Sequence, residues 1–202
     1  MESDLPELTG KTVIVTGANS GIGFEAARRF ALNGAQVVMA CRNMKKAEDA
    51  LQQIKSEAPQ ASVEILQLDL SSLESIKRFS EVFSQTYPEL HVLCNNAGVF
   101  ALPYSKTADG FEKQFGVNHL GHFALTGHLL KSLLQTPNSR VVNVSSMSYW
   151  FVRLDFDDLF SEKKYSRWGA YAKSKLANML FTYQLQKLFE EQGVDTIAVS
   201  CH

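Results

Sequence analysis

The chain reads Thr16-Gly17-Ala18-Asn19-Ser20-Gly21-Ile22-Gly23 between an apolar β-branched run, residues 12–15, and an amphipathic segment. Strand, glycine turn and helix start therefore follow in the order that a nucleotide-binding βα unit requires. Gly17 is expected to turn the chain off the strand end, where φ is positive, and Gly21 to let backbone approach a pyrophosphate. Gly23 is expected to let the helix pack closely on the sheet. Free N–H groups at the helix start then face the phosphates.

The side chains inside this turn belong to the same predicted cofactor set. Asn19 and Ser20 offer hydrogen bonds to a bound nucleotide, and Ile22 lies in the first turn of the helix. The spacing is G-x-x-x-G-x-G rather than the G-x-G-x-x-G of the general dinucleotide motif. Because ordinary tight βα turns also use glycine, the pattern alone does not separate a nucleotide site from a plain turn.

Length and composition predict one domain, residues 1–202, because 45% of the residues are hydrophobic and 20% are charged. A net charge of −1 gives no reason to expect nucleic acid or an anionic membrane as partner. No apolar run approaches the ~20 residues of a membrane span, and the acidic N-terminus lacks the layout of a signal peptide. Cys41, Cys94 and Cys201 each adjoin an expected strand and indicate packed, reduced thiols. These features favour a cytoplasmic protein.

Apolar β-rich runs alternate with helical patterns along nearly the whole chain. The expected strands are residues 12–16, 36–40, 63–68, 92–95, 140–144 and 196–200. The expected helices are residues 21–33, 45–56, 72–86, 110–135 and 171–192. Such alternation predicts an α/β fold, a doubly wound parallel sheet of the Rossmann type with six strands. Ligands of such sheets bind outside the carboxyl ends of the strands.

Two residues at strand ends bear on the choice of nucleotide. Arg42 follows the second strand, where an acidic residue would favour a free ribose 2′-hydroxyl and a cation favours a 2′-phosphate. NADP(H) is therefore preferred over NAD(H), unless Arg42 is simply a solvated arginine. Asp69 ends the third strand beside Leu70, which is also in the cofactor set. Its carboxylate suits an adenine amino group and equally the cap of the helix near residue 72, and the two roles are not exclusive.

The fourth strand ends in Asn95-Asn96-Ala97-Gly98. Small and amide residues in a row suit a backbone that passes close to a ligand, with the asparagine side chains joining strands to each other. Asn96, Ala97 and Gly98 are therefore placed in the predicted cofactor set. A plain turn is the alternative, since asparagine and glycine dominate turns.

Tyr171 and Lys175 are four residues apart in an expected helix and so share one face. A phenol titrates near ~10 in water. A neighbouring ammonium lowers the pKa of a phenol, so that Tyr171 is expected to serve as acid toward a carbonyl or base toward an alcohol. Ser146, at the end of the fifth strand, is expected to hydrogen-bond the same oxygen and stabilise developing charge. Strand alternation sends Ser145 and Ser146 to opposite faces, so from the residues alone Ser145 rather than Ser146 could face the site.

These motifs together resemble the short-chain dehydrogenase/reductase family, and the resemblance runs from about residue 8 to residue 202. Within it, the stretches 40–44, 101–105 and 117–123 are similar to an oxidoreductase domain that accompanies WW domains, and then to retinol dehydrogenases. The resemblance implies a nicotinamide cofactor bound by Tyr171 and Lys175 as well, and catalysis by Ser146, Tyr171 and Lys175. It also implies that Asn118 links Lys175 to a chain of waters.

The substrate is expected to be a small apolar carbonyl or alcohol compound, retinoid-, steroid- or lipid-like. Aromatic residues within 147–168 are consistent with an apolar substrate mouth, and equally with a satellite core beneath a long loop. His119, His122 and His128 share one helical segment, but no matching cysteine or carboxylate ligands accompany them, so no metal is expected.

The sequence also differs from the family's pattern in one respect. Family members continue past the sixth strand with a substrate-covering lobe and a seventh strand. Both are expected to be missing from these 202 residues. Two hypotheses follow: an NADP(H)-dependent oxidoreductase, or a catalytically impaired form that acts through protein–protein contacts. A nucleotide-sugar epimerase ranks third. A homodimer through the helices that carry Asn118 and Tyr171 is one expected assembly.

Overall fold

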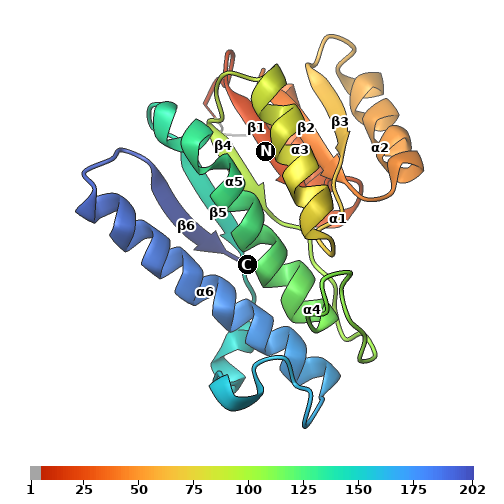
Figure 1. Cartoon of the computed structure of the whole chain (residues 1–202). Coiled ribbons are helices and arrows are strands. Elements are labelled where there is room, and N and C mark those ends of the chain that lie inside the picture. The colour runs from red at the N-terminus through yellow and green to blue at the C-terminus, as the bar shows by residue number, and fades with distance from the viewer. Residues whose placement is uncertain (1–5) are drawn as a thin grey trace.

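The computed structural model describes residues 6–202 and contains one sheet of six parallel strands in the order β3-β2-β1-β4-β5-β6 (Figure 1). The strands are β1 (Thr12–Thr16), β2 (Gln36–Cys41), β3 (Val63–Gln67), β4 (Val92–Asn95), β5 (Arg140–Val144) and β6 (Ile197–Cys201). The chain builds the sheet from β1 outward to β3, then returns to the other side of β1 and continues to β6. The predicted doubly wound fold is confirmed, with strand ends shifted by one residue at most.

Helices cover both faces of this sheet. They are α1 (Gly21–Leu32), α2 (Met44–Glu57), α3 (Leu73–Thr86), α4 (Lys113–Phe115), α5 (Gly121–Gln135) and α6 (Arg167–Glu191), with shorter turns η1 (Gly116–Leu120), η2 (Met147–Phe151) and η3 (Phe156–Asp158). In Figure 1, α3, α5 and α6 lie in front of the sheet, and α1 lies behind it. A crevice is expected where the strand order reverses, between β1 and β4, outside their carboxyl ends.

Alternate residues of the central strands enter two separate cores, because successive side chains of a strand point to opposite faces. Ile14 packs with Leu93 and Val141 beneath α3, α5 and α6. Val13 and Val15 pack with the alanines of α1 and α2. Short alanine side chains let these two helices lie close to the sheet, which is what brings the start of α1 up to the end of β1.

The expected helix 110–135 begins later than predicted. Gly110 has φ of +88° and lies in a turn, and Lys106 and Glu112 form an antiparallel bridge. Both carboxylate oxygens of Glu112 then accept N–H groups, from Gln114 at 2.9 Å and Phe115 at 2.8 Å, and so fix the helix start. The helix also contains a π-type turn, η1, before it continues as α5.

Other expectations differ in smaller ways. α6 begins at Arg167 rather than near residue 171, because the Ser166 side chain caps it by accepting the N–H of Gly169. Cys41 and Cys94 are buried, as expected, whereas Cys201 is exposed on the edge strand β6. Across residues 6–202, no helix has the length and apolarity that a bilayer crossing demands.

Candidate functional site

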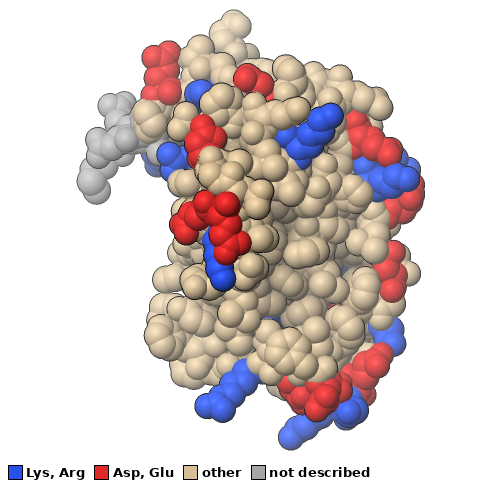
Figure 2. Space-filling view, turned by 60° about the vertical axis from the view of Figure 1, so that its left-hand side comes forward, with Lys and Arg blue, Asp and Glu red and all other residues tan. Residues whose placement is uncertain are grey.

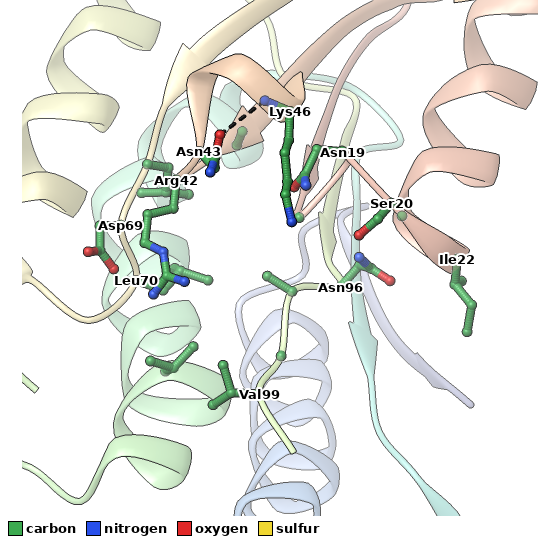
Figure 3. A pocket seen from close by; sticks show the side chains of 17 residues that line it. Asn19, Ser20, Ile22, Arg42, Asn43, Lys46, Asp69, Leu70, Asn96 and Val99 are labelled. Carbon is green, nitrogen blue, oxygen red and sulfur yellow. Dashed lines mark hydrogen bonds between the residues drawn. The ribbon is translucent and has the colours of Figure 1, made fainter. Parts of the chain in front are cut away.

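A cavity of about 490 Å³ opens at the carboxyl ends of the strands, at the point where the strand order reverses (Figure 3). Most of the residues predicted to bind the cofactor line it. They are Gly17, Asn19, Ser20, Ile22, Gly23, Arg42, Asp69, Leu70, Asn96, Ala97 and Gly98. Gly21 lines an adjoining hollow between α1 and α2 instead, together with Asn19, Ser20 and Lys46.

The glycine turn has the geometry that its sequence predicts. Gly17 has φ of +67°, which a side chain rarely adopts. A Cβ on Gly23 would clash with the Asn96 side-chain nitrogen and lie 2.5 Å from the Gly17 carbonyl oxygen, so a glycine here lets the start of α1 lie close to the ends of β4 and β1. Ser20 begins α1 without a side-chain capping bond. The first N–H groups of α1 therefore have no helical partner at the wall of the cavity.

Two cations extend into the cavity from the β2–α2 connection (Figure 3). Arg42 was predicted here, and Lys46 was not. Asn43 caps α2 by accepting the N–H of Lys46 at 3.0 Å, which places Lys46 in the first helical turn, four residues after Arg42. The place of Lys46 in the first turn of the expected helix, directly after a strand end, was the available sequence signal for it. Asn43 and Val99 also line the cavity and were missed.

Asp69 has a local role besides lining the cavity. Its Oδ1 accepts the N–H of Ser71 at 2.9 Å and the hydroxyl of Ser71 at 2.7 Å. The helix cap is Ser72, which accepts the N–H of Ser75 at 3.2 Å. The prediction that Asp69 itself caps α3 is therefore wrong. The carboxylate instead closes a turn at the strand end.

The segment Asn96–Val99 crosses the floor of the site. Thr16 Oγ1 accepts the N–H groups of Asn96 and Ala97, both at 2.9 Å, and the Asn96 side chain donates to the Thr16 carbonyl at 2.8 Å. On the neighbouring strands, Asn95 donates to Asn143 at 2.8 Å. The asparagines thus join strands to one another, as the sequence predicted. A Cβ on Gly98 would lie 3.3 Å from the Asn118 amide oxygen, so the segment passes in close contact.

A second cavity of about 400 Å³ adjoins the first and shares several of its lining residues, which are Ile22, Asn96, Gly98 and Val99. Ser146, Tyr171 and Lys175 line it, so three of the four predicted catalytic residues meet in one place. Phe100 and Met147 also line it and were not predicted. Ser145 reaches the same wall, and its hydroxyl donates to the Lys175 carbonyl at 2.9 Å.

Lys175 is 4% exposed, and its ammonium donates to the Val144 carbonyl at 2.8 Å. It lies 5.6 Å from the centre of the Tyr171 ring. Burial lowers the pKa of Lys175 to about 8, because the charged form loses its hydration. The amine therefore titrates much closer to neutral pH than an exposed lysine does.

Asn118 lies behind the floor segment and is fully buried. Its side-chain oxygen accepts the Val99 N–H at 2.7 Å, and its side-chain nitrogen donates to the Val99 carbonyl at 3.0 Å and to Ser174 at 3.0 Å. No direct hydrogen bond joins it to Lys175 among the described residues. The amide thus clamps the floor segment onto α6.

The aromatic stretch after Ser146 was expected to form either an apolar substrate mouth or a satellite core, and its residues divide between buried and exposed positions. Phe160 packs on Phe111 and Phe115, at ring distances of 5.4 and 5.8 Å, as a satellite core does. Other large side chains of the stretch stay exposed, namely Met147, Trp150, Phe151, Phe156 and Trp168. Phe100 meets both Trp168 and Tyr171 edge to face, at 4.8 and 4.6 Å. An apolar rim therefore borders the second cavity.

The residues present fit a dinucleotide. One end of the double cavity offers two cations and an uncapped helix start, which suit phosphates. The middle offers backbone without bulky side chains at Gly17, Ala97 and Gly98. The other end brings a phenol, a hydroxyl and an amine together.

Comparison with known proteins identifies the family to which the chain is similar. A family model for short chain dehydrogenases matches residues 11–202. Human retinol dehydrogenase 12 is 51% identical over 193 residues, which cover 96% of this chain and 61% of that protein. Human WW domain-containing oxidoreductase is 47% identical over 202 residues, covering 96% of this chain and 49% of that protein. The resemblance inferred from the motifs is confirmed, and the chain spans about three fifths of the length of retinol dehydrogenase 12.

Solved structures with a similar fold lead to the same family. An uncharacterized protein from Mycobacterium paratuberculosis superposes with a TM-score of 0.88 at 44% identity, over 98% of this chain and 69% of that one. A short chain dehydrogenase from Shigella flexneri, solved in complex with NADP, gives a TM-score of 0.76 at 25% identity, over 96% of this chain and 77% of that one.

Proposed function

The chain belongs to the short-chain dehydrogenase family, and from that premise we propose that it is an NADP(H)-dependent oxidoreductase of carbonyl and alcohol compounds. The observation that carries this proposal is the joining of two cavities. One presents Arg42, Lys46 and a helix start, and the other presents Ser146, Tyr171 and Lys175. A single dinucleotide spanning both would bring its nicotinamide end to the phenol.

The residues divide the chemistry between them. A bound nicotinamide supplies or accepts the hydride. In reduction, the Tyr171 hydroxyl gives its proton to the carbonyl oxygen; in oxidation, the phenolate takes the proton of the alcohol. Ser146 donates a hydrogen bond to that same oxygen and stabilises the charge that develops on it. The ammonium of Lys175, 5.6 Å from the Tyr171 ring, stabilises the phenolate electrostatically.

The preference for NADP(H) over NAD(H) rests on the two cations at the end of β2. Arg42 presents a planar donor fork that suits a 2′-phosphate, and Lys46 adds a second positive charge to the same wall. The Shigella flexneri relative was solved with NADP, which agrees with this preference. Asn118 acts through the floor segment that it clamps, alongside the three residues that line the second cavity.

The proposed substrate is apolar, retinoid-, steroid- or lipid-like. Phe100, Met147 and Trp168 border the second cavity with apolar surface, and several relatives are named retinol dehydrogenases. The test is NADPH oxidation by the purified chain with retinal-like and steroid-like carbonyls, beside a short polar carbonyl. Turnover of the apolar compounds is expected. NADPH binding without turnover would favour action through protein–protein contacts.

Assembly and compartment are further parts of the proposal. Apolar side chains on α5 and α6 lie exposed, among them Phe123, Leu180 and Tyr183. They support a homodimer across these helices, which Phe123→Arg should disrupt in light scattering. The three unpaired thiols support a cytoplasmic location.

A further inference from the structure

His122 hydrogen-bonds to two separate parts of the site, the end of β1 and the turn before α5. It is 2% exposed and lies at the start of α5. Its Nδ1 lies 3.0 Å from the backbone carbonyl of Asn118, and its Nε2 lies 2.9 Å from the hydroxyl of Thr16. One imidazole therefore connects the end of β1, next to the glycine turn, with the π-type turn that holds Asn118.

The partners of His122 fix its protonation. The Asn118 carbonyl only accepts hydrogen bonds, so Nδ1 carries the proton and Nε2 is an acceptor. The Thr16 hydroxyl then donates to Nε2, at 2.9 Å, in preference to the Cys94 carbonyl, which lies farther away at 3.4 Å. Its two lone pairs accept the N–H groups of Asn96 and Ala97, both at 2.9 Å. The hydroxyl thus uses its full hydrogen-bonding capacity, and the imidazole is neutral. Burial agrees with this, because it lowers the pKa of His122 to about 4.

The same two partners hold the floor of both cavities. At one end, Thr16 pins Asn96 and Ala97 through their N–H groups. At the other end, the Asn118 side chain pins Val99 through its N–H and its carbonyl. His122 bonds to both Thr16 and Asn118. Asn178 adds a second hydrogen bond to the Asn118 carbonyl at 3.1 Å. Nothing else among the described residues bonds to both Thr16 and Asn118.

We propose that His122 is a positioning residue that sets the floor segment Asn96–Val99 for nucleotide binding, acting through Thr16 and Asn118. The inference rests on the proposed function, because it assigns the floor segment to a nucleotide. A histidine serves here because its two ring nitrogens face opposite directions, one donating and one accepting. An aliphatic side chain fills the space but removes the nearer acceptor of the Thr16 hydroxyl, which keeps only the Cys94 carbonyl at 3.4 Å, and one donor to the Asn118 carbonyl, which keeps Asn178.

The experiment compares NADPH affinity, by calorimetry, in His122→Leu and Thr16→Val, with the double variant beside them. Both changes remove the hydrogen bond between His122 and Thr16, and Thr16→Val also removes the acceptor of the Asn96 and Ala97 N–H groups. His122→Leu is therefore expected to weaken NADPH binding roughly ten-fold, and Thr16→Val by at least as much. The double variant should lose less affinity than the sum of the two single losses, because the shared bond is lost only once. Fully additive losses, or an affinity of His122→Leu within about two-fold of the parent chain, would overturn the proposal.

Two features keep the test independent of folding and of the proposed function. His122→Gln retains an amide toward Thr16 and should recover part of the affinity, whereas His128→Gln, on the exposed side of the same helix, should change nothing. Amide hydrogen exchange of Asn96 and Ala97 should quicken in His122→Leu without nucleotide, although that variant keeps the Thr16 hydroxyl that both amides bond to. If the parent chain binds no NADPH, the proposed function fails, and unchanged exchange at these amides would separately refute the positioning role.

Discussion

The two halves of the sheet are covered differently, although one row of side chains crosses both. Met39, Val15, Cys94, Val142 and Val199 are register partners on successive strands and face the side of α1 and α2. Met39 and Val15 are fully buried, Val142 is half-buried and Val199 is 40% exposed. Figure 2 looks toward the side of α6 and β6, where the middle of the view carries few charged side chains. Packing on this face therefore weakens from β1 toward β6.

Polar side chains also hold the second half, on the opposite face of the sheet, toward α5 and α6. Asn95 donates to Asn143 at 2.8 Å, and Asn143 donates to Thr182 of α6 at 2.9 Å. Such a buried ladder fixes strand positions through directional bonds. The half of the sheet from β1 to β3 is thus held by apolar packing on both faces, and the half from β4 to β6 by one core plus a polar network. The proposed nucleotide-binding end and the proposed catalytic end of the site therefore rest on different forces and should respond separately to substitution.

The largest expected effect separates the two ends of the site. Tyr171→Phe removes the proposed proton donor and should lower turnover roughly 1,000-fold, while NADPH affinity stays within about two-fold. Steady-state kinetics and calorimetry check the two quantities. Tyr183→Phe, exposed on the same helix, is the matched control and should leave both unchanged. Equal turnover in the two variants would contradict the assignment of Tyr171.

Lowering the pH should reduce the folding stability through protonation of His122, which bonds Thr16 of β1 and the Asn118 carbonyl. Its folded-state pKa is lowered to about 4 by burial, opposed by its bond to Asn118 and assisted by the charges of Lys175 and His119. The unfolded chain therefore binds more protons between pH 6.5 and 4, and stability is lost as pH falls through that window. The loss from this group is about 3 kcal/mol by pH 4.

Urea unfolding at pH 7 and pH 4 measures this loss. Burial lowers the pKa of His91 and His119 as well, so they contribute in the same direction. His122→Gln isolates the contribution of one group, and its unfolding free energy should fall less steeply with acid. A slope identical to that of the parent chain would rule out His122 as the source.

A pair of matched substitutions tests the difference in packing directly. Val15→Ala should cost about 2 kcal/mol of unfolding free energy, because it opens a cavity in a fully buried row. Val199→Ala, in the same row on β6, should cost well under about 1 kcal/mol because solvent already reaches it. Chemical denaturation compares them. Equal costs would mean that the two halves are packed alike.

The smallest effect concerns the second cation. Lys46→Ala should weaken NADPH binding roughly five-fold and leave NADH binding unchanged, because an exposed charge beside a phosphate contributes about 1 kcal/mol. Lys45→Ala removes an equal charge from a neighbouring position that does not line the cavity. Titrations at low salt show whether the two variants differ. Identical affinities would remove Lys46 from the phosphate wall.

Local sequence predicted much of this arrangement because it depends on short-range geometry. The turn at Gly17 follows from the need for positive φ, and the strands follow from their continuous β-branched runs. Tyr171 and Lys175 share a face through helical spacing alone. The doubly wound order then places their helix near the glycine turn.

The misses depend on contacts that the sequence does not display. The helix start at Lys113 is set by a bridge between Lys106 and Glu112 and by the carboxylate cap of Glu112. Ser72 rather than Asp69 caps α3, although both residue types suit the position. His122 showed only a helical spacing, and its two partners lie on elements far apart in the chain. Tertiary hydrogen bonds decided each case.

Calorimetric titration of the 202-residue chain with NADPH and with NADH tests the central claim most directly, with Arg42→Asp alongside. NADPH is expected to bind at least ten-fold tighter than NADH, with the preference abolished in Arg42→Asp because the carboxylate repels the 2′-phosphate. If the folded parent chain binds neither nucleotide, the proposal that the two joined cavities hold a nicotinamide dinucleotide is wrong.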